Sequence, residues 1–116
     1  DFGDAIRFGA NHNTEDETDL SKVNFDITLF ESFTKGFVSA VNGTLTQVEK
    51  DHLAFSAILI TYELGMRFLG DYLNGDVYFK CKRPNHNLDR TRTQMKLIQD
   101  MEEQLPLMKE IVRKYT

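Results

Sequence analysis

Apolar residues recur every three or four positions along most of this chain, which is the spacing that buries one face of an α-helix. This pattern first covers Asp4–Phe8 and stops at Gly9. It returns over about Ile27–Val41, where the apolar positions of one face are Phe30, Phe33, Phe37 and Val38. Alternation at every second residue is weak and confined to 77–82. The pattern therefore predicts an all-α helical bundle with almost no sheet.

Residues with capping side chains mark where these helices begin and end. Asp26 precedes the second helix, and its carboxylate can accept the free N–H groups of the first turn. The run from Thr46 to Glu49 is a capping box, in which each of these two side chains bonds the backbone N–H of the other residue. Asn42-Gly43-Thr44 matches an N-glycosylation acceptor, but we interpret it as the turn between the helices.

The third helix continues to about Leu73 and is apolar on most sides between Leu53 and Leu69. We interpret it as the central helix, with the others packed around it. Gly65, inside it, would fit the close approach of a neighbouring helix. Glu63 and Arg67 interrupt the apolar run, so a buried core helix is favoured over a membrane span.

Two further helices are expected, from about Leu88 to Gln104 and from Pro106 to Tyr115, because proline lacks an N–H and should kink or restart the helix. Their apolar positions form one continuous seam at three- and four-residue spacing. The seam consists of Leu88, Thr91, Met95, Ile98, Met101, Leu105, Met108, Val112 and Tyr115. We interpret it as packing against the third helix, and a homodimer seam is the alternative.

Two segments between the helices lack a helical period. Asn11–Ser21 is polar and acidic and is expected to form a surface loop. Asn74–Asp76 fits a turn, and an extended or irregular segment over 77–82 follows it and closes at Pro84.

Composition narrows the class of protein. The 116 residues suit one domain or one lobe of a larger fold. A net charge of −4 gives no general attraction to nucleic acid or anionic lipid, so neither is expected as a partner. The single cysteine, Cys81, suits a reducing compartment, and we expect a cytoplasmic protein. Because a helical pattern starts at once without an initiator Met, we expect the C-terminal piece of a larger protein.

The opening triplet Asp1-Phe2-Gly3 matches the magnesium-binding triplet of protein kinases, but the other parts of such a kinase do not accompany it. We interpret Asp1 or Asp4 as supporting the start of a helix, where a carboxylate accepts free N–H groups. The histidines have no metal-ligand spacing with one another or with Cys81, so no metal site is expected.

Charged and aromatic side chains after the third helix are the candidates for ligand binding. Glu63 and Arg67 lie four residues apart and are expected to form a structural ion pair, or else Arg67 holds a loop that shapes a substrate pocket. A basic and aromatic region follows, and it can hydrogen-bond a polyhydroxylated ligand or simply be solvated. It comprises Tyr78, Lys80, Lys82, Arg83, Arg90 and Arg92.

Four phrases of the sequence carry a family resemblance: DFGDAIRFGAN, TEDETDLSKVNFD, YELGMRFLGDYLNGDVYFK and HNLDRTRTQMKLIQDMEE. Together they resemble the C-terminal part of bacterial N-acetylhexosamine 1-kinases, in the aminoglycoside phosphotransferase and choline kinase-like superfamily. The resemblance covers nearly the whole chain. It implies that residues 1–116 are the helical subdomain of a kinase-like C-terminal lobe, which forms one wall of the sugar site.

The resemblance also implies a reaction, the ATP-dependent transfer of a phosphoryl group to the anomeric hydroxyl of an amino sugar. The nucleotide-binding N-terminal lobe would be missing, and the catalytic and magnesium-binding Asp residues would lie in segments upstream of residue 1. ATP and Mg²⁺ are therefore expected only in the complete protein, and no catalytic or metal-binding residue is expected within this chain. Substrate contacts are assigned to Asp4, Phe25, Tyr78, Lys80 and Arg90, and structural support to Asp1, Arg7, Glu63 and Arg67. The alternative is a helical interaction or dimerisation module without catalysis, working through its C-terminal seam.

Overall fold

The computed structural model describes residues 1–41 and 43–116. These residues form helices α1 (Phe2–Gly9), α2 (Ile27–Val41), α3 (Gln47–Leu73) and α4 (His86–Tyr115), with a short 3-10 helix, η1 (Leu20–Lys22). The described residues contain no β-strand, and one isolated antiparallel bridge joins Asn11 to Phe25. The predicted all-α class is therefore confirmed. Asn42, and with it the glycosylation pattern, lies outside the described residues.

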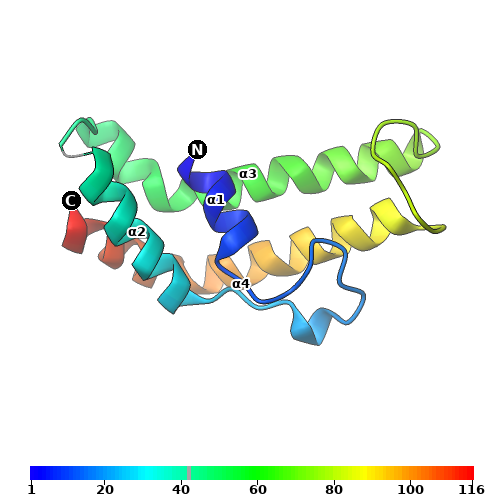
Figure 1. Ribbon diagram of the computed structural model, residues 1–116, viewed down its shortest axis with the longest axis horizontal. Helices are drawn as coiled ribbons and strands as arrows, with labels where there is room; N and C mark the ends of the chain where they lie inside the picture. Colours follow the sequence, from blue (N-terminus) through cyan, green and yellow to red (C-terminus); the bar gives the residue numbers. More distant parts are fainter. Residues whose placement is uncertain (42) are drawn as a thin grey trace.

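The two long helices α3 and α4 run side by side in opposite directions and give the molecule its elongated shape, 45 × 26 × 20 Å (Figure 1). Helix α1 packs against α3, and α2 packs against the C-terminal part of α4. The loop over 74–85 joins α3 to α4 at the far end of the pair, away from α2.

Side-chain caps set the helix starts as the sequence predicts. Asp1 Oδ1 accepts the N–H of Asp4 at 3.1 Å, so the first helix begins at Phe2 rather than at Asp4. Asp26 Oδ1 accepts the N–H groups of Thr28 and Leu29 at the start of α2. The capping box of α3 is complete, because both of its predicted hydrogen bonds form, at 3.1 and 3.2 Å.

The apolar core lies where α1 and the C-terminal half of α4 meet α3, and α2 closes it by packing against α4 and α1. Phe30 is fully buried, and its ring lies 6.0 Å from that of Phe2 and 5.8 Å from that of Phe25. Phe37 is half-buried and also packs on Phe2, at 5.0 Å between ring centroids. Phe33 is 41% exposed, so the predicted buried face of α2 is narrower than its four apolar positions suggested.

Pro106 does not divide the last helix, and the prediction of two helices over 88–115 is wrong. Proline in a helix removes one hydrogen bond and crowds the carbonyl four residues earlier, here that of Glu102. Both Pro106 and Glu102 are exposed on the outer side of α4. Water can therefore reach the freed carbonyl, and packing of the opposite face keeps the helix continuous.

The predicted C-terminal seam lies inside the fold. Each of its nine residues is buried or partly buried, and Met101 and Met108 have no exposed surface. The interpretation as intrachain packing is therefore confirmed. A dimer or an interaction module could not use this seam without unpacking the chain.

Helix α3 is packed on two sides rather than on most sides, which corrects its interpretation as a surrounded central helix. A Cβ added to Gly65 would contact Met95 and Gln94, which confirms the close approach of α4. A Cβ added to Gly3 would lie 2.6 Å from the Ser56 carbonyl oxygen, because α1 approaches α3 as closely as α4 does. The remaining face of α3 carries exposed apolar side chains. By length and composition alone α3 could cross a membrane, a weak criterion that core helices also satisfy.

Candidate functional site

A pocket of about 390 Å³ lies at the loop end of the α3–α4 pair. The last turns of α3 form one side of it and the segment over 77–79 forms the other. Its lining residues are Arg67, Gly70, Asp71, Asn74, Val77, Tyr78 and Phe79. The volume falls within the usual range for small-molecule sites, roughly 300–1,000 Å³. The pocket contains Tyr78, the aromatic residue that the sequence favours for ligand binding.

Asp71 holds the loop that forms this pocket. Its Oδ1 accepts the N–H groups of Val77 and Tyr78, at 3.0 and 2.8 Å. Its Oδ2 accepts the N–H of Phe79 at 2.9 Å and the side-chain amide of Asn87 at 2.7 Å. One buried carboxylate thus replaces the strand or helix partners that three consecutive backbone N–H groups lack.

These hydrogen bonds also set the ionisation of Asp71. Burial opposes the charged form, but the N–H groups of Phe79 and Tyr78, the Asn87 amide and the N–H of Val77 outweigh it. The pKa of Asp71 is therefore lowered from its ordinary value. The carboxylate remains charged at neutral pH, and charge-assisted hydrogen bonds of this kind are the stronger ones.

Asn87 and Arg90, on the first turns of α4, hold the other side of the loop. The Asn87 amide also donates to Asp76, and its carbonyl oxygen accepts from Arg90 Nη1 at 2.8 Å. Arg90 Nη2 donates to the Lys80 carbonyl at 3.0 Å, and the guanidinium lies 5.7 Å from the centre of the Phe68 ring. Arg90, predicted to contact substrate, is therefore engaged in fixing the loop.

Among the described residues, Arg67 and Glu63 form no ion pair, contrary to the expectation. Both side chains are exposed. The expectation assumed that the whole helix was buried, and an exposed charge needs no partner. The Arg67 guanidinium instead lies 5.7 Å from the ring centres of both Tyr78 and Phe79. This geometry matches the alternative, in which Arg67 positions the loop around a pocket.

The structure separates the predicted substrate residues into three places. Tyr78, Lys80 and Arg90 lie together at the loop end, with Tyr78 72% exposed. Asp4 lies on α1, where its Oδ1 accepts from Arg7 Nε at 2.9 Å. Phe25 is 5% exposed and its ring packs on Phe30 in the core. A buried ring of this kind presents no face to a ligand in this structure.

Arg7 forms a second polar cluster beside α1. Its guanidinium is buried and donates to Asp4, to Glu15 at 2.9 Å and to Gln94 at 3.4 Å. The expected supporting role of Arg7 fits this position. Glu15 belongs to the acidic segment predicted as a surface loop, which is therefore attached to the bundle. Asp16, in the same segment, accepts from the buried His86 at 2.7 Å.

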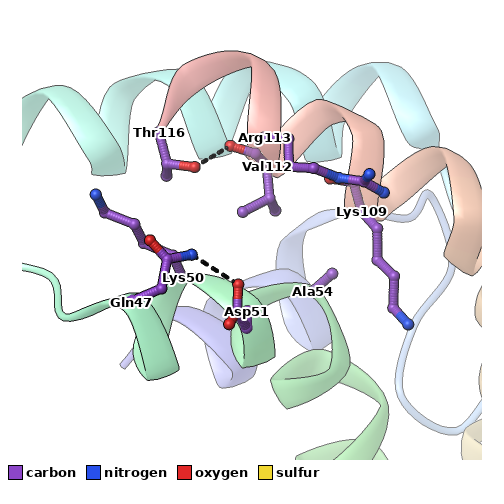
Figure 2. Close-up of a pocket in the computed structure, with 8 residues that line it drawn as sticks. All are labelled: Gln47, Lys50, Asp51, Ala54, Lys109, Val112, Arg113 and Thr116. Atoms are coloured by element: carbon purple, nitrogen blue, oxygen red, sulfur yellow. Dashed lines mark hydrogen bonds between the residues drawn. The ribbon is translucent and has the colours of Figure 1, made fainter.

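Another pocket, of about 270 Å³, lies between the start of α3 and the end of α4 (Figure 2). On the wall of this pocket, Gln47 donates to Asp51 at 2.8 Å and Thr116 donates to the Val112 carbonyl at 2.7 Å (Figure 2). These polar groups therefore bond to residues of their own helix. The amines of Lys50 and Lys109 end on opposite sides of the pocket in this view. These cations do not converge on a shared point, so the loop-end pocket is the better candidate.

Sequence reasoning missed Asp71 and Asn87, which organise the site. One signal was present: an acidic residue in the last turn of a helix opposes the helix dipole, so it needs donors from elsewhere. The following turn at Asn74–Asp76 returns the chain toward that carboxylate. A carboxylate just before such a turn is therefore a useful indicator of a clamped loop.

No family model matches the sequence. Within residues 1–41 and 43–116, no group of three or more His, Cys, Asp and Glu side chains is arranged to hold a metal ion.

Proposed function

We propose that this chain is the substrate-side helical part of an ATP-dependent kinase that phosphorylates an N-acetylhexosamine at its anomeric hydroxyl. One observation carries the proposal: Arg67 and Tyr78 lie together on the wall of a pocket whose loop is fixed by Asp71. The resemblance of the sequence to N-acetylhexosamine 1-kinases supports the same assignment. In the complete protein we expect a cytoplasmic enzyme.

The chemistry of the pocket suits an amino sugar. A pyranose ring has an apolar face of C–H groups, which can lie on the exposed Tyr78 ring. Its hydroxyl and acetamido oxygens are acceptors for the Arg67 guanidinium, which presents several N–H donors in a fixed plane. The Asn74 side chain, also on the wall, can both donate and accept. Few groups are therefore needed to bind and orient the ring.

The phosphoryl-transfer chemistry is assigned to the rest of the complete protein. The described residues offer no arrangement of ligands for Mg²⁺, and the sequence has no phosphate-binding glycine loop. This chain would contribute orientation of the acceptor, which can supply several kcal/mol of a reaction barrier. Asp4, beside Arg7 on α1, would act at the boundary with the catalytic segments.

The direct test uses the complete gene product with ATP, Mg²⁺ and a panel of sugars. We expect ADP release with N-acetylhexosamines, and NMR of the product should place the phosphate on the anomeric carbon. Absence of turnover with every amino sugar, or phosphorylation at another hydroxyl, would contradict the proposal.

Two substitutions in the complete protein locate the acceptor site. Tyr78→Ala should raise the KM for the sugar about tenfold or more, an estimate from the contribution of positioning, and leave the KM for ATP unchanged. Leu107→Ala is the control, because Leu107 is also exposed but lies on α4 outside the pocket. Asp4→Ala should lower kcat about tenfold or more. Unchanged turnover in a folded Asp4→Ala protein would show that Asp4 has no role in the reaction and only contacts Arg7.

A further inference from the structure

One face of α3 carries a row of exposed apolar side chains along its whole length, interrupted once by His52. We call it the α3 stripe, and its members are Val48, Phe55, Leu59, Tyr62, Met66, Leu69 and Leu73. They are between 38% and 74% exposed. Together with the exposed His52, they occupy every position of a repeat that alternates steps of four and three residues over the whole helix. This repeat is the seam spacing of a two-stranded coiled coil.

The neighbouring helices leave the α3 stripe uncovered. At 3.6 residues per turn, the stripe lies about 120° around α3 from the buried residues Ala57, Thr61 and Gly65, which face α4. Helix α1 covers another side, where Gly3 meets Ser56. The stripe is therefore a third, separate face of α3.

The area of the stripe is large for an isolated protein surface. Taking a fully exposed large side chain as roughly 200 Å², the exposed fractions amount to about 770 Å². The largest apolar patch on a monomer is usually about 300–600 Å². The area is close to the share of about 800 Å² that each partner contributes to a standard interface.

We propose that two copies of this chain associate through the α3 stripe, with the two α3 helices packed antiparallel. The proposal needs no ligand, and it requires that no other part of the complete protein covers the stripe, which the test below examines. Pairing that covers two stripes fully would remove about 1,500 Å² from water, within the range of stable interfaces, roughly 1,200–2,000 Å².

The sequence of the stripe is complementary to itself in one antiparallel register. In that register Val48 lies opposite Leu73 of the second copy, Phe55 opposite Met66, and Leu59 opposite Tyr62. The two-fold axis passes beside the centre of α3, so the whole helix contributes to the pairing. His52 then lies opposite Leu69 of the second copy.

The charges beside the stripe permit the same register. Glu63 lies opposite Ser56 of the second copy, and Glu49 lies opposite Gly70. No two acidic side chains of α3 face each other, so the pairing meets no like-charge repulsion across the seam. The same two glutamates beside the stripe, with a net charge of −4, disfavour an anionic membrane as the occupant.

The first test is sedimentation of the complete gene product, and of this chain alone, over a range of about 1–100 µM, where a standard interface of modest affinity would be half-formed. Dimers of this chain alone, with a monomeric complete protein, would mean that another part of the protein covers the stripe and would overturn the proposal. We expect a monomer–dimer equilibrium. Leu59→Glu combined with Met66→Glu should raise the dissociation constant about a hundredfold or more, since each buries a charge in the seam. Leu107→Glu is the matched control: it adds the same charge at an exposed apolar position on α4 and should change nothing. Circular dichroism should show that every variant retains its helices.

A second test reads the direction of the helices. A spin label at Asp51→Cys, in a Cys81→Ser background, should give about 28 Å between the two labels of an antiparallel pair, from the rise of 1.5 Å per residue. A parallel pair would give about 10 Å, the distance between helix axes. A distance near that value would overturn the proposal, as would a dimer that survives the double variant. A chain that remains monomeric, whether or not it then binds lipid vesicles, would also overturn it.

Discussion

The two halves of α4 are buried by opposite chemistry. Every buried side chain between 86 and 94 is polar, whereas every buried side chain from 97 onward is apolar. The apolar half packs against α2 and the aromatic cluster around Phe30. The polar half packs beside the loop that Asp71 holds. The C-terminal half of α4 therefore contributes mainly to stability, and the N-terminal half mainly fixes the geometry of the loop.

The difference matters because apolar burial has no preferred direction, whereas hydrogen bonds do. A packed core tolerates small shifts of side chains at modest cost. A buried carboxylate with four donors fixes the backbone of its loop, because any displacement leaves a polar group unpaired. A ligand pocket needs the second kind of support, and the candidate pocket lies at that end.

The largest expected effect comes from making a cavity in the core that covers the apolar half of α4. Phe30→Ala should lower the free energy of unfolding by about 3–5 kcal/mol, because it removes a fully buried ring and leaves a cavity. Urea denaturation followed by circular dichroism measures the change. Phe33→Ala, on the same helix but 41% exposed, is the control and should lose well under half as much. Equal losses would show that α2 does not anchor the core through Phe30.

Asp71→Asn should act on the polar half alone. The amide keeps one acceptor but presents its own N–H groups toward the donors, so the loop loses part of its support. We expect amide hydrogen exchange over 77–79 to accelerate about tenfold or more, while unfolding of the helices changes less than in Phe30→Ala. Asp76→Asn is the control, since Asp76 accepts a single bond from Asn87. Unchanged hydrogen exchange at these amides would show that the Asp71 carboxylate does not hold the loop.

Acidification should distinguish the two halves without mutation. The pKa of Asp71 is lowered by donors that outweigh burial, and the pKa of Asp16 is lowered chiefly by its hydrogen bond to His86. A carboxyl whose pKa falls on folding stabilises the fold above its ordinary pKa, about 4, and loses that contribution as the pH drops through the lowered value. The pKa of Asp26 and that of Glu31, at α2, are lowered too, by hydrogen bonds to His12 and Lys114, but both carboxyls are partly exposed and water can replace these contacts. NMR spectra recorded from neutral pH downward should therefore lose the loop signals before those of the buried Phe30 ring. Simultaneous loss would contradict a separate polar half.

Periodicity and caps predicted the helices because those signals are local. The bounds of α2 and the capping box of α3 follow from residues within one turn of each other. Pro106 misled because its effect depends on which face of α4 meets solvent, and that is decided by packing. The same holds for the pairing expected between Glu63 and Arg67, since the sequence does not show that their face of α3 is exposed.

The candidate site was predicted only in part, for a related reason. Tyr78 could be selected by residue type, and it lies on the pocket wall. Asp71 could not, because its role depends on three backbone groups that a turn brings back to it. Phe25 was selected through the family resemblance and its residue type, but it is buried by contacts with other elements. Residue type identifies candidates, and tertiary contacts decide which remain accessible.

The smallest expected effect tests the other end of α3, where a cap is exposed to water. Thr46→Ala removes one half of the capping box and should lower the free energy of unfolding by about 1 kcal/mol. The loss is modest because water can replace the missing acceptor at an exposed helix start, whereas no water replaces the carboxylate inside the Asp71 loop. Thr44→Ala, two residues earlier and also exposed, controls for the change in residue type and should have no measurable effect. Thermal unfolding of the two variants measures the difference, and a loss as large as that of Phe30→Ala would mean that the apolar half also depends on a single directional contact.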